Sequence, residues 1–413
     1  MKKPAVALVM HDFEKQEKEV SANLGMPGLR IQYFQGPVWA KTNEQIRKQI
    51  VEGNNPLNGK PVMRELVELL TKPLTAGEKK TGEVLKDVGP GTYTGTPDEL
   101  QKLFLEKRYT DFLPVVLPTE EKVAEMLKAT SHEPDEVLGR MNPGSEAGET
   151  WTYTVKDAAV NAVMAGALPE YFPVILALGS TGMTAVNVSD NGFMAGAVIN
   201  GDIRDEIGLN YEEGAVGPYA HANTAIGRAW SLLSINGGNC GKVGTTYMGT
   251  IGNPMNLIGI IIAENEGKSP FRPLSVRRGF QKGESVVTLF MGWGILSAKN
   301  WAATAWGPNM NYPEIIKEIY GTQDGHLFGT CAVLSPPIAN FVKDAGYRTV
   351  EEFTEWVTGL PPDAKPAGFG GINSGVRKAG GAFTVIVTGG SNNNYFSMGG
   401  MVPSQSVQID GWR

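Results

Sequence analysis

The second half of the chain contains short apolar runs bounded by glycine, and this pattern limits the folds that the chain can form. Runs of this length between turn signals are typical of buried strands. Two stretches with helical periodicity, residues 223–235 and 349–357, lie among them. Interleaved strands and helices predict an α/β or α+β fold, here a larger glycine-rich mixed α/β domain. The runs are MAGAVING, TTYMGTIG, LIGIIIAE, SVVTLFMGWG and FTVIVTGG.

Glycine is frequent, at 52 of 413 residues, with clusters such as INGGNCGKVG, GFGGIN and TGGSNNNYFSMGG. Glycine adopts positive φ without strain and lets the backbone approach a ligand or another segment closely. Two interpretations follow from this property. Either the clusters form tight turns between short strands, or their backbone amides cradle a ligand.

The N-terminus has the pattern of a βαβ unit. PAVALVM (4–10) and LRIQYFQ (29–35) are predicted as strands, and residues 12–25 between them as an amphipathic helix with Gly25 as its C-cap. Residues 42–70 predict two helices joined by a turn. Two parallel strands with one covering helix leave strand edges unpaired, so we expect this unit to complete a sheet made elsewhere.

The predicted domain organisation has three parts. Residues 1–70 form a partial α/β domain that another chain could complete, and residues 71–95, rich in Lys, Gly, Pro and Thr, form a linker or arm. Residues 96–413 form the main α/β domain, with a division into two lobes near 280–300 as an alternative. The chain exceeds the ~250 to 300 residues at which single cores usually stop growing.

Helices open the main domain. Thr96 or Asp98 is expected to cap a helix in TPDELQKLFLEKRYT, and EEKVAEMLKAT is predicted as the next helix. TVKDAAVNAVMAGALPEYFPVILALGST has the pattern of two helices that are broken at residues 166–169. The strand-rich pattern begins only after these helices.

Composition excludes several classes of protein. The net charge is −6 and there is no basic stripe, so nucleic acid is not an expected partner. No apolar run approaches the ~20 residues of a membrane span, and the start MKKPAVALVMHDFE lacks the features of a signal peptide, so we expect a cytoplasmic protein. Two cysteines provide neither a disulfide framework nor a thiolate zinc site.

The segment AENEGKSPFRPLSVRRGF (263–280) concentrates charged residues directly after an apolar run. Glu264 and Glu266 point the same way if the backbone is extended, so they could share a proton, bind a cation or meet arginines. Arg272, Arg277 and Arg278 follow, and a guanidinium recognises carboxylate or phosphate bidentately. The alternative is an internal salt-bridge lattice that pins the loop.

His221 and Cys240 are further candidates. His221 precedes Asn223 and Thr224, either of which could cap a helix running through Arg228, and a helix N-terminus attracts anions. The alternative is a surface or capping histidine. Cys240 lies between glycines whose amides could favour a thiolate, although a lone cysteine is commonly a small core residue.

Metal and cofactor sites are weakly indicated. The four histidines are scattered and form no HxH or HxxxH pair, which disfavours a histidine metal site. The acidic turn NGDIRDEIGLN, with Asp202, Asp205 and Glu206, is interpreted as solvated rather than magnesium-binding. Cys331, in the apolar FGTCAVL, is interpreted as a core residue. The sequence predicts no particular cofactor.

Several motifs, in one order, resemble the C-terminal region of the bacterial UGSC-motif (seleno)proteins, a family named for a Sec-Gly-Ser-Cys or Cys-Gly-Ser-Cys motif. They are DFLPVVLPTEEKVAEML, TVKDAAVNAVMAGALPEYFPVILA, NGDIRDEIGLN, ANTAIGRA and AENEGKSPFRPLSVRRGF, and more loosely FTVIVTGGSNNNYFSMGG. Glu264, Asn265, Glu266 and Arg278 belong to the shared pattern, whereas Lys268, Arg272 and Arg277 are local variation. His221, Cys240 and SNNNY depart from the family pattern.

The N-terminus resembles the second half of the family's small domain that carries the motif, and the first half with the motif is absent. This resemblance implies a small partner subunit that supplies the missing strands and the reactive thiol or selenol, docked on the N-terminal strands. Such an interface should be large and apolar. The alternative is a degenerate domain that closes on itself or by homo-oligomerisation.

The leading functional hypothesis is an enzyme subunit that acts on a small polar or anionic substrate. Glu264 and Glu266 would provide acid/base groups or cation ligands, and His221 a proton donor, with Cys240 as another catalytic candidate. Arg278, Arg228, Asn223 and Asn265 would bind substrate. A partner's thiol or selenol would make the reaction a redox step or a carbon–sulfur or carbon–heteroatom bond reaction. The alternatives are a redox-independent lyase or hydrolase, and a non-catalytic scaffold or binding subunit.

Overall fold

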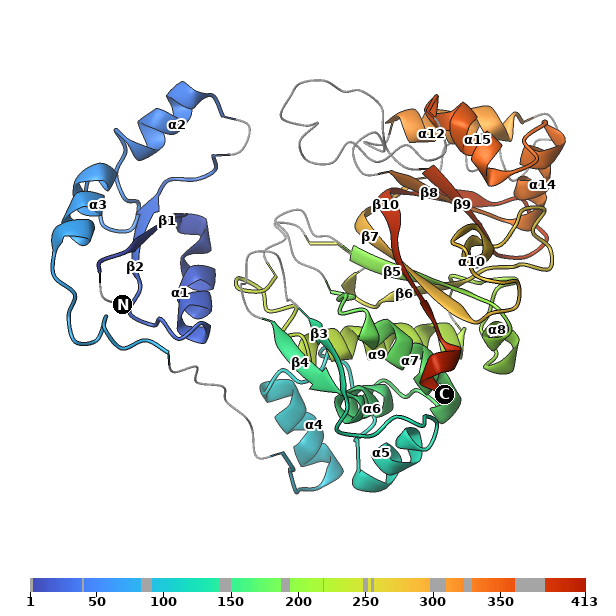
Figure 1. The fold of residues 1–413 in the computed structure, drawn as a ribbon, viewed down its shortest axis with the longest axis horizontal. Coiled ribbons are helices and arrows are strands. Elements are labelled where there is room, and N and C mark those ends of the chain that lie inside the picture. Colours follow the sequence, from blue (N-terminus) through green and yellow to red (C-terminus); the bar gives the residue numbers. More distant parts are fainter. Residues whose placement is uncertain are drawn as a thin grey trace.

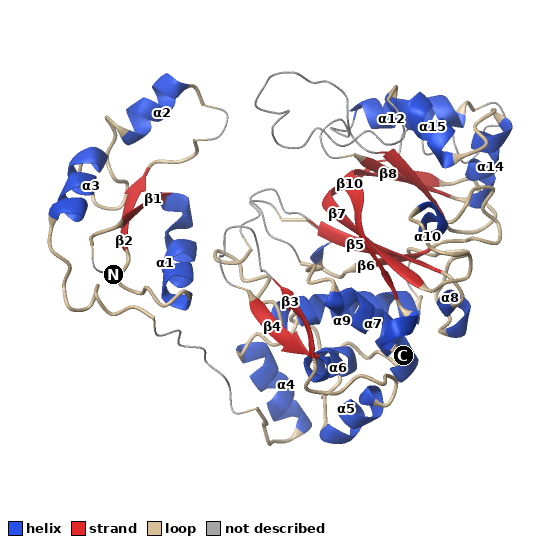
Figure 2. Ribbon diagram, viewed as in Figure 1, coloured by secondary structure: helices blue, strands red, loops and turns tan. Residues whose placement is uncertain are grey.

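A computed structural model shows an N-terminal unit and a larger mixed α/β body (Figure 1, Figure 2). Both helices and mixed sheets are present, which confirms the predicted α/β or α+β fold class. No helix in the described part of the chain is long and apolar enough to cross a membrane. The structure describes residues 3–38, 41–82, 91–141, 150–186, 194–217, 219–247, 252–253, 256–297, 310–322, 329–360 and 383–413.

The N-terminal unit is the predicted βαβ fragment. β1 (Val6–Met10) and β2 (Arg30–Phe34) pair in parallel, with α1 (Glu14–Asn23) between them in sequence. Helices α2 (Asn43–Ile50) and α3 (Val62–Thr71) follow as expected. The sheet has two strands, and no third strand within the described ranges joins it.

Part of the expected linker is attached to the N-terminal unit. The Arg30 guanidinium donates to the carbonyl oxygens of Lys72 and Pro73 at 2.8 Å and pairs with Glu78 at 2.7 Å. The hydrogen bond from the Arg30 guanidinium lowers the pKa of the Glu78 carboxyl to about 2. Residues 72–82 therefore extend this unit, while residues 83–90 lie outside the described ranges.

A helical layer opens the larger body. Thr96 caps its first helix with a capping box, as predicted, and residues 165–171 separate two of the helices at the predicted break. A short hairpin of β3 (Val137–Met141) and β4 (Trp151–Thr154) lies beside these helices. The helices are α4 (Pro97–Glu106), α5 (Glu120–Leu127), α6 (Val155–Met164), α7 (Phe172–Ser180) and α9 (His221–Asn236).

The main sheet has six strands in the order β6-β5-β7-β10-β8-β9. The pairs β5/β6 and β8/β9 are parallel, and the other neighbours are antiparallel. Helices α12 (Tyr312–Thr322), α14 (Pro336–Asp344) and α15 (Val350–Thr358) belong to its second half. The strands are β5 (Met194–Asn200), β6 (Ile260–Ala263), β7 (Val286–Ser297), β8 (Thr330–Leu334), β9 (Phe383–Val387) and β10 (Tyr395–Gln408).

Most of the strands predicted for the main sheet are present, with one exception and two additions, and the β3/β4 hairpin outside this sheet was also not predicted. TTYMGTIG lies partly outside the described residues, and its described part makes only an isolated bridge between Val243 and Tyr247. The strands β8 and β10 were not predicted from the sequence. β7 covers most of the stretch 280–300, where the two lobes were expected to divide, and pairs with strands on both sides.

The sheet consists of two halves with the same topology. In each half a strand pairs in parallel with an edge strand and antiparallel with a long central strand: β5 with β6 and β7, and β8 with β9 and β10. The backbone bonds match as well. The Glu264 amide donates to Ile199 O at 3.1 Å, and the Thr388 amide donates to Leu334 O at 2.9 Å. Glu264 therefore corresponds to Thr388.

The inner face of the sheet forms a core of its own. One cluster contains buried side chains from all six strands, which requires the sheet to curl around it. A second cluster joins the sheet to α6, α7 and α9, and a third joins it to α12, α14 and α15. The inner residues are Val198, Ile262, Leu274, Phe290, Cys331, Val333, Ile386, Met398 and Met401.

The two edge strands meet at their carboxyl ends. The Asn265 amide donates to Val387 O at 2.7 Å, and the Thr388 hydroxyl donates to Ala263 O at 2.7 Å. These bonds close the curled sheet at one corner. They also bring the segment after β6 next to the glycine-rich loop after β9, although the two are more than a hundred residues apart in sequence.

Candidate functional site

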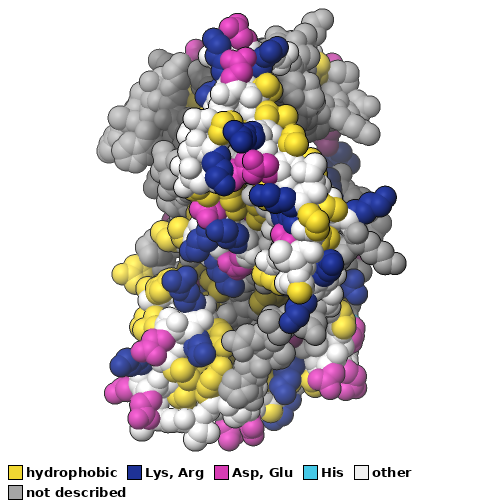
Figure 3. Space-filling model, turned by 90° about the vertical axis from the view of Figure 1, so that its left-hand side faces the viewer, with side chains coloured by type: hydrophobic (Ala, Val, Ile, Leu, Met, Phe, Trp, Pro, Cys, Tyr) yellow, Lys and Arg dark blue, Asp and Glu magenta, His cyan; other side chains and the backbone are white. Residues whose placement is uncertain are grey.

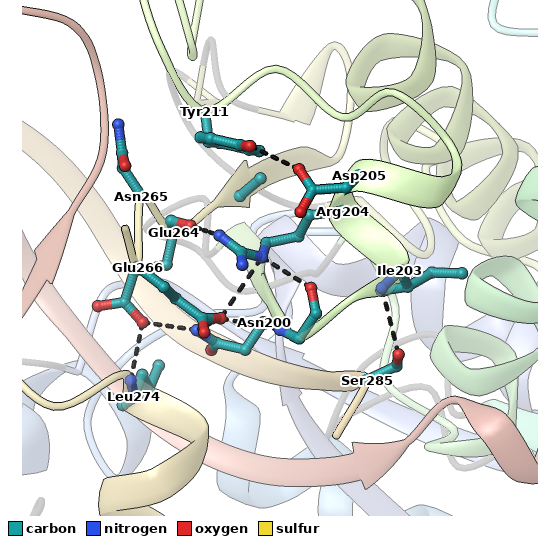
Figure 4. Close-up of polar contacts among 12 residues, drawn as sticks. Asn200, Ile203, Arg204, Asp205, Tyr211, Glu264, Asn265, Glu266, Leu274 and Ser285 are labelled. Atoms are coloured by element: carbon teal, nitrogen blue, oxygen red, sulfur yellow. Dashed lines mark hydrogen bonds and ion pairs between the residues drawn. The ribbon is translucent and has the colours of Figure 1, made fainter. Parts of the chain in front are cut away.

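Glu264 is enclosed at the carboxyl end of β6. It is 1 % exposed, and its Oε2 accepts hydrogen bonds from Asn200 Nδ2 and the Leu274 amide, each at 2.7 Å (Figure 4). Leu274 begins the one-turn helix α10 (Leu274–Arg277), so the carboxylate accepts from the start of this helix. Burial raises the pKa of Glu264, while Arg277 and the two donors oppose this shift.

Glu266 extends the same network toward β5. Its Oε1 accepts from the Gly201 amide at 2.8 Å and from Asn200 Nδ2 at 3.0 Å, and lies 3.4 Å from Arg204 Nε. Arg204 is buried; it donates to the carbonyl oxygens of Gly201 and Glu264 and stacks on the Tyr211 ring. The carboxylates thus meet donors from the protein itself, which favours the lattice interpretation of this segment.

Arg277 connects the network to the opposite edge strand. It donates to the Thr384 hydroxyl at 2.9 Å and to Val385 O at 2.6 Å, both on β9. Asn265 makes a similar connection, because its side-chain amide donates to Gly389 O at 3.2 Å. Arg277 and Asn265 therefore tie the segment after β6 to β9 and its following loop. These bonds hold the corner at which the two edge strands meet.

A pocket of about 260 Å³ lies at the carboxyl ends of β8 and β9, directly beside this corner. Its floor comes from the ends of these strands and the start of β10, and one wall is the glycine-rich loop after β9. The opposite wall is residues 213–216, which belong to the segment between β5 and α9. The loop residues that line it are Thr388, Gly389, Gly390, Ser391, Asn392 and Asn394.

One wall of this pocket carries a charged group, Glu213, and the next residue along the chain, Glu212, is charged as well. Glu213 Oε1 accepts from the Ser391 amide at 3.1 Å, and this bond lowers the pKa of the Glu213 carboxyl. Lys268 Nζ pairs with Glu212 at 2.5 Å. The Gly389 amide donates to Tyr211 O at 2.9 Å and anchors the start of the same segment. The lining of the pocket therefore includes backbone amides, hydroxyls, side-chain amides and one carboxylate.

A second depression lies far from these groups. It measures about 520 Å³ and is an open surface hollow between α5 and Pro169, lined by Glu121, Glu125, Lys128 and Ala129. No candidate residue from the sequence lines it. Because it is shallow and belongs to the outer helical layer, we place the candidate site in the smaller pocket beside the sheet.

Other predicted substrate-binding residues are engaged elsewhere. Arg278 lies outside the network and donates to Ser404 O and the Ser406 hydroxyl on β10. Arg228 forms a bidentate pair with Asp111, with both distances 2.9 Å. The structure does not bring either guanidinium to the pocket or to Glu264 and Glu266.

The start of α9 differs from the expected arrangement. Neither Asn223 nor Thr224 caps the helix, because α9 already begins at His221 and Ala220 provides no side-chain cap. Asn223 instead exchanges hydrogen bonds with the Asn210 backbone and donates to Ile261 O. His221 is exposed, and its Nδ1 contacts the Tyr171 hydroxyl at 3.1 Å. Among the described contacts, none joins His221 to either carboxylate.

Both cysteines are buried. Burial raises the pKa of the Cys240 thiol to about 12, and it also raises that of Cys331, which packs in the inner core. A thiol with a raised pKa is protonated near neutral pH and is a poor nucleophile. Cys240 is therefore not activated in this conformation, whereas the core interpretation of Cys331 agrees with its surroundings.

The acidic turn shows no metal-binding arrangement. Asp205 accepts from the Tyr211 hydroxyl at 2.5 Å, and Glu206 pairs with Arg413. Over the described ranges, no group of three or more His, Cys, Asp or Glu side chains is arranged to hold a metal ion. The structure thus gives no ligand set from which to name a cofactor.

Sequence reasoning missed several residues of this region. Arg277 was assigned to local variation, although it is the arginine that bonds β9. Glu213 and Ser391 are 178 residues apart, so no local pattern could have paired them. The glycine cluster TGGSNNN was the available signal, because the interpretation as a ligand cradle points to this loop.

No protein-family model, curated protein or solved structure matches this chain. The resemblance to the UGSC-motif family therefore stays a prediction from the quoted motifs.

The lattice interpretation predicts a large loss of stability when Glu264 is removed. Glu264→Ala leaves the Leu274 amide and one of the two Asn200 N–H donors buried without an acceptor, which should cost about 3 kcal/mol of unfolding free energy. Arg278→Ala, in the same segment but exposed, should cost less than about 1 kcal/mol. Chemical denaturation of both variants measures the difference. Equal and small losses would contradict a structural role for Glu264.

Proposed function

We propose that the chain is an enzyme subunit that binds a small polar or anionic substrate in the pocket at the carboxyl ends of β8 and β9. The pocket itself carries this proposal. Ligand sites are concave and combine apolar walls with a few convergent polar groups, and they commonly form outside the carboxyl ends of parallel strands. Val333, Leu334 and Phe396 supply the apolar floor, and the loop after β9 supplies polar groups.

The volume and the glycine-rich wall favour a small ligand. About 260 Å³ is at the low end for ligand pockets. Gly389 has φ +96°, which turns the backbone beside the pocket without the strain that a side chain would bring. The hydroxyl and amide groups of the loop, such as those of Ser391 and Asn392, suit a polar ligand rather than an apolar one.

The reactive group is the second part of the proposal. Cys240 and Cys331 are buried and protonated, so a thiol-dependent or selenol-dependent reaction in this pocket needs its nucleophile from another chain. With that nucleophile the reaction would be a redox step or a carbon–sulfur or carbon–heteroatom bond reaction. A lyase or hydrolase acting without a redox partner is the alternative, with Glu213 as the carboxylate that lines the pocket.

Blocking the pocket tests the binding proposal. Val216→Trp places an indole at the pocket wall, whereas Val243→Trp adds the same group at an exposed valine outside it. Saturation-transfer NMR with millimolar malonate, malonamide and glycerol should give signals for the wild type and Val243→Trp and lose them for Val216→Trp. Identical signals for all three proteins, or none for the wild type, would contradict the proposal.

The N-terminal unit supports the partner part of the proposal. β1 pairs only with β2 among the described strands, so no described strand occupies its other edge, and an unpaired edge is where a further strand can add. Figure 3 shows hydrophobic side chains among charged ones on the side of the molecule where this unit lies. We infer that a partner adds a strand to β1. The exposed large apolar residues of the unit are Leu8, Leu24, Val51, Leu57, Met63, Val67 and Leu70.

Complex formation tests the partner directly. A small protein of the Cys-Gly-Ser-Cys type, encoded beside this chain and co-expressed with it, should co-purify as a complex whose mass is the sum of both. Leu8→Lys, on β1, should abolish the complex, whereas Leu257→Lys, at an exposed leucine of the larger body, should not. A chain that remains a homomer in the presence of such a protein would overturn this part of the proposal.

A further inference from the structure

The two halves of the sheet differ at one pair of equivalent positions. The matching backbone bonds make Glu264 equivalent to Thr388, and Ile199 equivalent to Leu334. Two residues further along the chain, Glu266 is therefore equivalent to Gly390. In the same way, Gly201 is equivalent to Pro336. In the first half the Glu266 carboxylate occupies the space between the two strand ends and accepts from the Gly201 amide at 2.8 Å. In the second half glycine removes the carboxylate, and proline removes the amide donor. The pocket opens beside these residues.

A carboxylate nevertheless enters this space from another segment. Glu213 places its Oε1 3.1 Å from the Ser391 amide, against the face of Gly390. A Cβ atom on Gly390 would lie 2.1 Å from this oxygen, so the glycine is what lets the carboxylate approach the loop. The same loop thus binds a carboxylate through its backbone, as the first half does through Gly201.

The segment that carries Glu213 is held at other points. Tyr211 accepts from the Gly389 amide, Glu212 pairs with Lys268, and the Ala215 side chain is buried. Glu213 itself is exposed and makes its contact with the loop only at its carboxylate end. Releasing that carboxylate would therefore disturb its hydrogen bonds to Ser391 and leave the rest of the segment in place.

We propose that Glu213 is an internal occupant of the pocket, and that the ligand is a small carboxylate that displaces it from the Ser391 amide. This inference rests on the proposed function, because it assumes that the pocket is the binding site. It narrows the substrate class from polar or anionic to carboxylate. It also gives Glu213 a gating role, since the ligand and Glu213 compete for one donor.

Calorimetric titration with malonate and its neutral counterpart malonamide tests the competition. Glu213→Ala should bind malonate about tenfold more tightly than the wild type, because the occupant and its charge are both gone. Glu213→Gln, which keeps an acceptor for the Ser391 amide but loses the charge, should show a smaller gain. Malonamide affinity should change little in either variant.

Glu212→Ala is the matched control. It removes a negative charge one residue away and frees Lys268, so it measures the general electrostatic gain for an anion. The proposal requires a larger gain in Glu213→Ala than in Glu212→Ala. Equal gains, or an equal gain for malonamide, would overturn the gating role while leaving the pocket intact. If neither probe binds any of the proteins, the proposed function fails as well.

Discussion

The hydrogen bonds that join the carboxyl ends of β6 and β9 are the constraint on which the rest of this structure depends. These strands lie at opposite edges of the sheet order, yet Asn265 and Thr388 bond across the gap between them. The sheet must curl to allow this contact, and the curl produces an inner core to which all six strands contribute. Arg277 reinforces the corner from α10.

The same corner explains why a charged network and a pocket are neighbours. Each half of the sheet ends in a space between two parallel strands, where unpaired backbone groups must be satisfied. The first half fills its space with the hydrogen-bonded side chains of Glu264, Glu266 and Asn200. The second half has Gly390 and Pro336 at the corresponding positions, and the Glu213 carboxylate enters the space beside the pocket there. One half therefore supports the fold, and the other carries the pocket that we propose as the binding site.

Much of the fold could be predicted because local signals agreed with tertiary structure. Thr96 caps its helix as expected, and the βαβ unit follows from apolar runs and one amphipathic helix. β10 was missed because YFSMGGMVPSQSVQ contains glycines and a proline, and the strand accommodates them with two register shifts against β7. β8 was missed because FGTCAVL was interpreted only as an apolar context for Cys331.

The candidate site was harder to predict, because it depends on the direction of side chains and on distant partners. The sequence identified Glu264 and Glu266 but could not tell a catalytic pair from a lattice. Arg277 and Arg278 are adjacent, and only the single turn of α10 sends the first to β9 and the second to β10. Glu213 meets Ser391 through the closure of the sheet, which no local pattern reports.

Amide hydrogen exchange at Asn265 tests the closed corner most directly, because its amide bonds to Val387 O on the opposite edge strand. The account predicts that this amide exchanges as slowly as the central β7 amides, such as that of Leu289, and only through global unfolding. Exchange at the rate of an exposed loop, with β7 still protected, would contradict the closure of the sheet and the arrangement of both strand ends that follows from it.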